Sequence, residues 1–402
     1  MKPALALFVL AALLRLPWAL HPAVPEADAA DYLRLAGGIL AGEGFVDAGG
    51  APTAFRPPLY PLFLAALGAS PRLACAAHAV IGALTCLLVV LLARRLGAPA
   101  PAPWIAGAML ALDPIHVAAT AKLQSEILYQ ALLLGGLCLM VAPVRAPARE
   151  AAAGILFGLA VLTRAAAVPL LPVFAGWSVL RRPRAWRAAA AWAAGVLLAV
   201  APWLVRNAAV MDAPVLTTQG GITLYSSYHP PGGRLLGVLA QDATVAQANA
   251  QGEVRADREL RAAAARDALA DPLRTARLAA LKLAFFWLPV DWEVGAGGGA
   301  VSAVYLFAVP LAALAAWQGP RRYALLLAAF AALAVFSAAV YGSPRLRFPY
   351  DPLLYVMAAD ALVGVRRRAW VAAWAALTGA LWLSGTLLKQ GLRSTAALLG
   401  LW

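Results

Sequence analysis

The sequence predicts an all-α polytopic membrane protein with about eleven transmembrane helices and two non-cytosolic loops that carry short helices. Of its 402 residues, 63% are hydrophobic and only 13% are charged, a balance that no ordinary soluble domain needs. A spanning helix takes about 20 mainly apolar residues. Stretches of this kind recur from Pro3 nearly to the C-terminus. These observations exclude a soluble fold for most of the chain.

The first apolar stretch lies close to the N-terminus. Residues 4–14 follow Lys2, so a signal peptide is one interpretation. Arg15-Leu16-Pro17-Trp18 comes next, which lacks the small residues of a cleavage site. We therefore expect a retained first span.

Apolar stretches of suitable length follow along the rest of the chain. We expect further spans at about residues 73–93, 103–120, 125–142, 186–205, 300–317, 323–341, 348–364 and 369–388. Residues 150–180 form one more apolar stretch, which is interrupted by Thr163-Arg164 and by two prolines. This stretch is too long for one ordinary span and short for two.

The distribution of arginine decides how the chain is threaded. Short basic segments, which favour the cytosolic side, occur at Arg94-Arg95, Arg145 with Arg149, residues 181–187, Arg321-Arg322 and residues 366–368. They can share one side only if residues 150–180 cross the bilayer twice. Arg164 then lies at the tip of a short hairpin near the outer leaflet, and the N-terminus is cytosolic. The net charge of +14 follows from this topology, so it indicates no nucleic-acid partner.

Two outward segments are large enough to carry a function. The first comprises residues 21–72, with a helical stretch at 28–40 and a glycine-rich turn at 42–50. The second comprises residues 207–299, with helical spacing at 253–270. Asp271-Pro272 then provides an N-cap and a first-turn proline for another helix.

Carboxylates gather in and beside the first outward segment. Asp28 and Asp31 are three residues apart, so they share a helical face, with Tyr32 close by. They could act as a general base or help to hold a divalent metal. Alternatively, they are solvated acids near a helix start, where aspartate is common. Glu126 enters an apolar span directly after Ser125 and is either a site residue or an interfacial acid.

Five arginines lie at outward span ends or in outward loops: Arg56, Arg164, Arg206, Arg345 and Arg347. Guanidinium groups match phosphate oxygens in a bidentate geometry, although arginines also anchor spans to lipid headgroups. Anchors of that kind should favour the cytosolic side, so the outward position favours anion binding.

The remaining reactive residue types indicate no site. Cys75, Cys86 and Cys138 lie within apolar stretches without CxxC spacing, and we interpret them as packing residues. The four histidines show neither HExxH nor paired spacing, which argues against a zinc site.

The order of these motifs resembles the GT-C superfamily of polytopic glycosyltransferases, in particular the branch with aminoarabinose transferases and protein O-mannosyltransferases. The resemblance covers most of the chain and rests on order, because no single motif is decisive. The segments that carry it are Asp28-Ala29-Ala30-Asp31-Tyr32, Arg56-Pro57-Pro58-Leu59-Tyr60, Ser125-Glu126, residues 158–164, residues 202–207 and residues 345–352.

The resemblance implies a single GT-C-like domain over residues 1–402 that transfers a sugar from a polyprenyl-phosphate donor by an inverting displacement. It implies catalytic roles for Asp28, Asp31 and Glu126. It also implies substrate binding by Tyr32, Arg56, Tyr60, Arg164, Arg206, Arg345 and Arg347. The expected acceptor is a lipid, a polysaccharide or a protein. The resemblance implies no definite cofactor, and dependence on a divalent metal ion stays open.

The expected location is the inner membrane of a bacterium, with the site facing the periplasm, since alanine- and arginine-rich usage is typical of a GC-rich genome. The main alternative is a transporter or flippase for a lipid-linked saccharide, which predicts charges at the bilayer midplane and an inverted repeat. A catalytically inactive scaffold, or a polymerase or ligase of lipid-linked oligosaccharides, would keep the same fold.

Overall fold

The computed structural model describes residues 2–25, 28–143, 146–180, 186–229, 243–289 and 302–364, together with 374, 376 and 378. Within these ranges the chain is helical, and one isolated antiparallel bridge joins Val46 to Pro52 in the glycine-rich turn. The helices are α1 (Lys2–Leu20), α2 (Asp28–Leu40), α3 (Leu59–Ala66), α4 (Pro71–Arg95), α5 (Ala102–Leu112), α6 (Pro114–Ala118), η1 (Ala119–Ala121), α7 (Glu126–Met140), α8 (Pro147–Thr163), η2 (Ala165–Leu170), α9 (Leu171–Leu180), α10 (Trp186–Met211), α11 (Gln219–Tyr228), α12 (Ala243–Asn249), α13 (Glu253–Ala270), α14 (Pro272–Phe286), α15 (Ala303–Gln318), α16 (Ala324–Ala339), α17 (Pro344–Arg347), η3 (Phe348–Tyr350) and α18 (Asp351–Gly364).

Apolar helices of membrane-spanning length make this a multi-pass membrane protein. Helices α1, α4 and α10 have 19, 25 and 26 residues and are long and apolar enough to cross a bilayer. Helix α5 and the α6–η1 segment form a fourth candidate, bent by 54°. Shorter apolar helices occur at Glu126–Met140, Ala165–Val179, Ala303–Gln318 and Ala324–Ala339. The count of eleven spans stays a prediction, and its span at residues 369–388 lies outside the described ranges.

Local sequence explains where the longest helices begin and pack. At the start of α4, Ser70 accepts a hydrogen bond from the backbone N–H of Leu73 at 3.4 Å, and Pro71 occupies the first turn. Helix α4 then packs against α1, where the buried Arg15 donates to the carbonyl oxygen of Leu110 at 3.3 Å. Gly82 lies directly beneath this arginine side chain and leaves room for it.

The predicted break at Arg164 is present. Arg164 adopts an extended conformation (φ −148°, ψ 121°) between α8 and η2, and α9 continues after Leu170. Helix α8 packs along α10, where Gly154 and Gly195 let the two backbones approach closely, as small residues do in membrane helix pairs.

Helix α10 runs farther than predicted. Arg206 and Asn207 lie inside this helix, which ends at Met211, so the start of the expected loop 207–299 is helical. Asn207 donates from Nδ2 to the carbonyl oxygen of Val215 at 2.7 Å. This hydrogen bond holds the C-terminal end of α10 against the segment that follows it.

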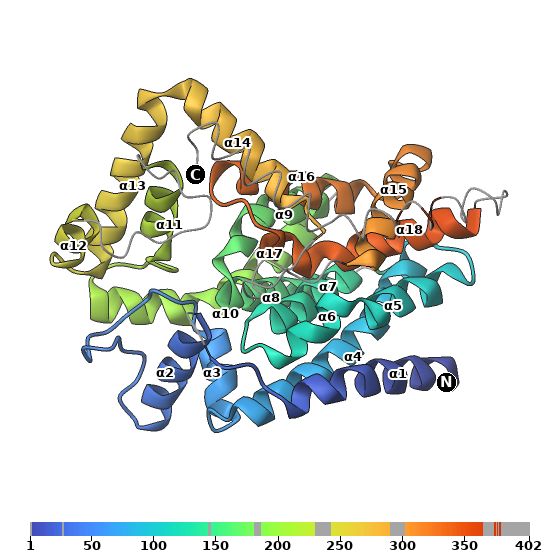
Figure 1. Cartoon of the computed structure of the whole chain (residues 1–402), viewed down its shortest axis with the longest axis horizontal. Helices are drawn as coiled ribbons and strands as arrows, with labels where there is room; N and C mark the ends of the chain where they lie inside the picture. Colours follow the sequence, from blue (N-terminus) through green and yellow to red (C-terminus); the bar gives the residue numbers. More distant parts are fainter. Residues whose placement is uncertain are drawn as a thin grey trace.

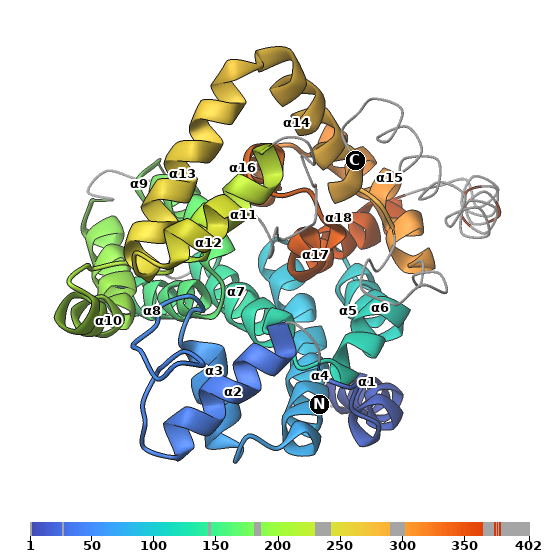
Figure 2. The same cartoon turned by 60° about the vertical axis from the view of Figure 1, so that its left-hand side comes forward.

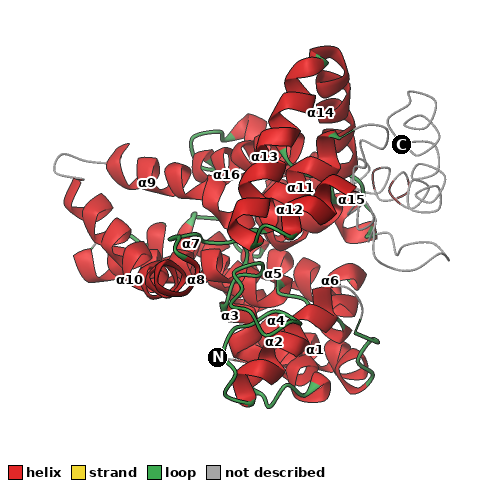
Figure 3. Cartoon of the chain, turned by 90° about the vertical axis from the view of Figure 1, so that its left-hand side faces the viewer, coloured by secondary structure: helices red, strands yellow, loops and turns green. Residues whose placement is uncertain are grey.

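The described helices of the two segments that are predicted to face outward lie at the same end of the molecule. Figure 1 shows α2 and α3 below and α11, α12 and α13 above at the left-hand end, and Figure 2 shows the same groups on either side of α7 and α8. Helices α11 to α14 share an apolar core of their own that includes Tyr225, Leu260, Leu278 and Phe285. Figure 3 shows α11 to α14 together in the upper part of the view, above α1 and α4.

Candidate functional site

The two aspartates at the start of α2 contact the same arginine. Arg56, which precedes α3, donates from Nη2 to Asp28 Oδ1 at 2.6 Å and to Asp31 Oδ2 at 3.0 Å. The predicted common face of Asp28 and Asp31 is therefore confirmed. The guanidinium of Arg56 also lies 5.1 Å from the ring centroid of Phe55, which fixes its plane.

A second arginine reaches the same aspartate from the other end of the sequence. Ser343 caps the short helix α17 by accepting from the backbone N–H of Arg345 at 3.1 Å. Arg345 then donates from Nη1 to Asp28 Oδ2 at 2.8 Å and from Nε to Glu126 Oε1. One guanidinium thus bridges two carboxylates from two different helices.

Glu126 is buried at the first turn of α7 and also contacts the break after α8. Arg164 Nη1 lies 2.5 Å from Glu126 Oε1 and donates to Ser125 Oγ at 3.2 Å. Among the residues that the structure describes, no hydrogen-bond partner contacts the other carboxylate oxygen, Oε2, although it is buried. Oε2 is therefore a buried acceptor without a partner among the described residues.

We name this group of six side chains the carboxylate–arginine cluster. It contains three carboxylates and three guanidinium groups, and each carboxylate pairs with at least one of these guanidinium groups. The six members are Asp28, Asp31, Glu126, Arg56, Arg164 and Arg345.

Charge pairing controls the protonation of Asp28. Burial by itself raises the pKa of this carboxyl, but Arg345 and Arg56 outweigh it and lower the pKa to about 2. Burial by itself lowers the pKa of Arg56, but Asp28, Tyr32 and Asp31 together outweigh it and raise the pKa. Both groups are therefore ionised at neutral pH.

The two tyrosines predicted to bind substrate lie beside Arg56. Tyr32 and Tyr60 pack edge to face, with ring centroids 4.8 Å apart, and the Arg56 guanidinium lies 5.5 Å from the Tyr32 ring centroid. The hydroxyl of Tyr60 is 3.2 Å from His78 Nε2, and the side chain is fully buried. Tyr60 therefore supports the cluster from within the fold.

Arg206 lies outside the cluster, although it was expected near the donor phosphate. Its guanidinium donates to the carbonyl oxygens of Phe45 and Thr53 at 2.6 and 2.8 Å. These bonds attach the first outward segment to α10. These contacts support a structural role for Arg206, and its expected contact with the donor phosphate stays a prediction.

Arg347 is likewise separate from the cluster. It is buried, donates from Nε to Asp351 Oδ1 at 2.7 Å and from Nη1 to the carbonyl oxygen of Phe286 at 2.7 Å. The face of Tyr305 covers the guanidinium, 3.6 Å from the ring centroid. This residue joins α14, α15 and α18, and its expected contact with the donor phosphate stays a prediction.

The donor set of the cluster suits an anion better than a divalent cation. Within the described ranges, no three His, Cys, Asp or Glu side chains are grouped so that they could hold a metal ion. Both oxygens of Asp28 accept from arginine, and the arginines are the groups that a phosphate could recruit. The divalent metal ion kept open above stays a prediction.

Glu253 is a residue whose role the sequence did not indicate. At the first turn of α13 it accepts from Thr53 Oγ1 at 2.6 Å, from the backbone N–H of Ala54 at 2.8 Å and from Thr218 Oγ1 at 2.5 Å. It thereby clamps the first outward segment to the second, next to Arg56. Acidic residues are common in the first turn of a helix, where they complement the helix dipole. The sequence therefore gives no sign that Glu253 makes contacts across the fold.

No protein-family model matches the chain, and no curated protein matches it at a significant level. A solved structure of an archaeal oligosaccharyltransferase, AglB from Archaeoglobus fulgidus in complex with an inhibitory peptide and a dolichol-phosphate, is similar at 15% identity with a TM-score of 0.46. The alignment covers 96% of this chain, which spans 55% of the length of that protein. A likeness of this size assigns no family.

Proposed function

We propose that this protein is a GT-C-type glycosyltransferase that moves a sugar from a polyprenyl-phosphate donor to an acceptor on the periplasmic face of a bacterial inner membrane. One observation carries the proposal: Arg345 bridges Asp28 and Glu126, with Arg56 and Arg164 on either side. A base beside several guanidinium groups suits a displacement in which a phosphate departs.

The location of the cluster supports a lipid-linked donor. Glu126 begins the apolar helix α7, and Arg164 follows the end of α8, so both lie where apolar helices end. A phosphate at this level could keep its polyprenyl chain along the apolar helices. Nucleotide sugars are made in the cytosol, so an outward-facing transferase requires a donor that is delivered through the membrane.

The ion pairs of Asp28 describe a resting state. A carboxylate with a pKa of about 2 is a weak base, and general bases work best with a pKa near the operating pH. When a donor phosphate binds, it competes for Arg345 and Arg164 by bidentate hydrogen bonds. Asp28 then loses one of its cations, and its pKa rises.

The reaction follows as a single displacement. Asp28 accepts the proton of the acceptor hydroxyl while the hydroxyl oxygen forms a bond to the anomeric carbon. The bond from that carbon to the phosphate oxygen breaks, and the electron pair leaves with the polyprenyl phosphate, which Arg345 and Arg164 stabilise. The anomeric configuration is inverted.

The other carboxylates have supporting roles in this scheme. The unpartnered Oε2 of Glu126 can accept a hydrogen bond from a sugar hydroxyl and orient the donor. Asp31 holds Arg56 through two hydrogen bonds, at 3.0 and 3.3 Å. A transporter would need these charges along a path through the bilayer, whereas the cluster joins helix ends and outward loops.

Reconstituted vesicles test this function. The full chain is incorporated with a polyprenyl-phosphate sugar that carries a radiolabel in the sugar, together with cell-envelope extract as the source of acceptor. We expect release of polyprenyl phosphate by the wild type and a loss of about 100-fold to 10,000-fold in Asp28→Asn, the range of a general base. Glu43→Gln, an exposed acid of the same outward segment, is the matched control and should retain full turnover. No turnover by the wild type, or equal turnover by Asp28→Asn, would refute the proposal.

A further inference from the structure

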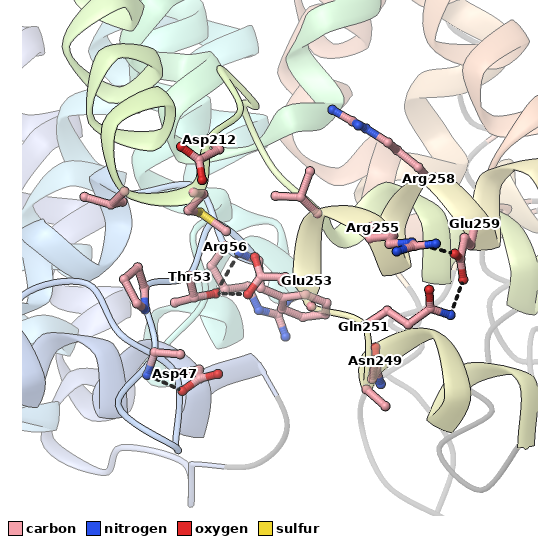
Figure 4. Close-up of a pocket in the computed structure, with 18 of the residues that line it drawn as sticks. Asp47, Thr53, Arg56, Asp212, Asn249, Gln251, Glu253, Arg255, Arg258 and Glu259 are labelled. Atoms are coloured by element: carbon pink, nitrogen blue, oxygen red, sulfur yellow. Dashed lines mark hydrogen bonds and ion pairs between the residues drawn. The ribbon is translucent and has the colours of Figure 1, made fainter.

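A large cleft opens between the two outward segments, beside the carboxylate–arginine cluster (Figure 4). Its volume is about 1220 Å³, above the range of roughly 300–1,000 Å³ that is common for small-molecule pockets. Its walls come from the start of α2 and the loop before α3, from the end of α10, and from the turn between α12 and α13 with the first turns of α13. The space is large enough for an extended ligand made of several linked units.

The walls of the cleft are held together by specific contacts. Glu253, on the α13 wall, accepts hydrogen bonds from Thr53 and Ala54 of the opposite wall. It also accepts one from Thr218, which precedes α11. On the α13 side, Gln251 and Arg255 both donate to the carboxylate of Glu259, at 3.0 and 3.1 Å. Figure 4 shows these three side chains together on the wall opposite Asp47 and Thr53.

The cleft meets the cluster on one side only. Asp31 and Arg56 line it, whereas the other four members, Asp28, Glu126, Arg164 and Arg345, do not. The cluster therefore has an aqueous side, which faces the cleft, and a side formed by α7, the break after α8, and α17. The donor phosphate belongs to the second side, where the apolar helices end. The cleft is therefore available to the acceptor, the second substrate of the proposed reaction.

The lining indicates the chemistry of that substrate. Acids and arginines are interspersed and nearly balance: Asp31, Asp47, Asp212, Glu253 and Glu259 against Arg34, Arg56, Arg255 and Arg258. Such a surface offers many hydrogen-bond donors and acceptors without a net field, which suits hydroxyl groups. A polyanion would require an excess of cations. An acyl chain would require a continuous apolar groove, whereas the apolar side chains of this lining, such as Leu35, Phe55 and Met211, alternate with charged ones.

We propose that this cleft binds the acceptor, and that the acceptor is a neutral, hydroxyl-rich saccharide chain whose terminal unit reaches Asp28 past Arg56 and Asp31. The inference rests on the proposed function, because it assigns the second substrate of the same site. It narrows the acceptor from lipid, polysaccharide or protein to an uncharged glycan segment.

Direct binding to the purified full chain tests this assignment without the donor. The probes are fluorescently labelled dextran, mannan and galactan oligosaccharides, with dextran sulfate and an uncharged unglycosylated peptide as comparisons. We expect at least one neutral oligosaccharide to bind, and its affinity to fall at least tenfold in the double variant Gln251→Ala/Arg255→Ala, since one lost hydrogen-bonding contact of about 1.4 kcal/mol already has that effect. Arg266→Ala, an exposed arginine of the same helix that does not line the cleft, should bind as the wild type does.

The outcomes separate this inference from the proposed function. Failure of all three neutral oligosaccharides to bind, equal affinity of the double variant, or tighter binding of dextran sulfate or the peptide overturns the cleft assignment, whatever the donor assay gives. Absence of donor turnover with intact, cleft-dependent saccharide binding overturns the transferase and leaves a saccharide-binding cleft. In the vesicle assay, label in the glycan fraction supports the inference, and label in the protein fraction alone contradicts it.

Discussion

Arg345 donates from Nη1 to Asp28 Oδ2 at 2.8 Å, although the two residues are 317 positions apart in the sequence. The same guanidinium donates from Nε to Glu126. Two nitrogens of one rigid planar group therefore set the spacing of the two carboxylates. A lysine carries a single compact charge and cannot form the same pair of hydrogen bonds from a planar group.

Arg345→Lys should for this reason lower donor turnover by about 100-fold, as expected when a preorganised group is no longer in place for the transition state. Release of polyprenyl phosphate in vesicles measures the change. Arg266→Lys, the same exchange at an exposed position, serves as the control and should keep wild-type turnover. Near-normal turnover of Arg345→Lys would show that charge alone suffices at this position.

The next prediction concerns an arginine outside the cluster. Arg347→Met leaves the buried carboxylate of Asp351 without its ion-pair partner, which typically costs about 3–5 kcal/mol of stability. We expect a lower thermal unfolding midpoint in detergent and recovery in the double variant Arg347→Met/Asp351→Leu, where both charges are removed. The KM for the donor should stay unchanged in protein that is still folded. A raised KM with a normal unfolding midpoint would place Arg347 at the donor instead.

The contrast between Arg345 and Arg347 shows what the sequence could and could not predict. Both belong to one Arg-x-Arg segment, and both were expected at the donor phosphate. Residues two apart on a helical turn point in different directions, so one reaches Asp28 while the other contacts Asp351 and the end of α14. Which of the two faces the site depends on how α17 is docked, and that is set by contacts distant in sequence.

Local patterns predicted the elements more closely. The helix at residues 28–40 and the helix at 253–270 have the predicted bounds, and Asp271 caps α14 by accepting from the backbone N–H of Arg274 at 2.9 Å. These features depend on neighbouring residues, and so does the break at Arg164. The Glu253 clamp depends on how two loops meet across the fold, so no local signal marked it.

The charge state of Asp28 leads to a prediction for pH. Its pKa is about 2 in the folded protein against 3.8 for an ordinary aspartate, so the folded state binds fewer protons than the unfolded state between these values. The resulting stabilisation of about 2 kcal/mol is fully present above about pH 4 and is lost as the pH falls towards 2. The wild type should therefore be more stable than Asp28→Asn at about pH 6, and this difference should shrink towards zero at about pH 2. Denaturation midpoints of both proteins across this range measure it, and a difference independent of pH would contradict the ion pairing.

Close packing of α8 against α10 positions the residue that follows α8. A Cβ atom added at Gly154 would lie 2.0 Å from the carbonyl oxygen of Trp192, so the two backbones would have to separate. Because Arg164 leaves the end of α8 and contacts Glu126 at 2.5 Å, such a separation would move this arginine away from the cluster.

Gly154→Ala should accordingly lower both the thermal unfolding midpoint and donor turnover, since overpacking of this kind costs about 1–3 kcal/mol. Gly176→Ala is the matched control in the apolar helix α9, where an added Cβ atom meets nothing within 4 Å. The control should be neutral or slightly stabilising, because alanine is favoured over glycine within a helix by about 1 kcal/mol. If Gly154→Ala lowers the midpoint but leaves turnover of the folded protein intact, the α8–α10 contact supports the fold without positioning Arg164.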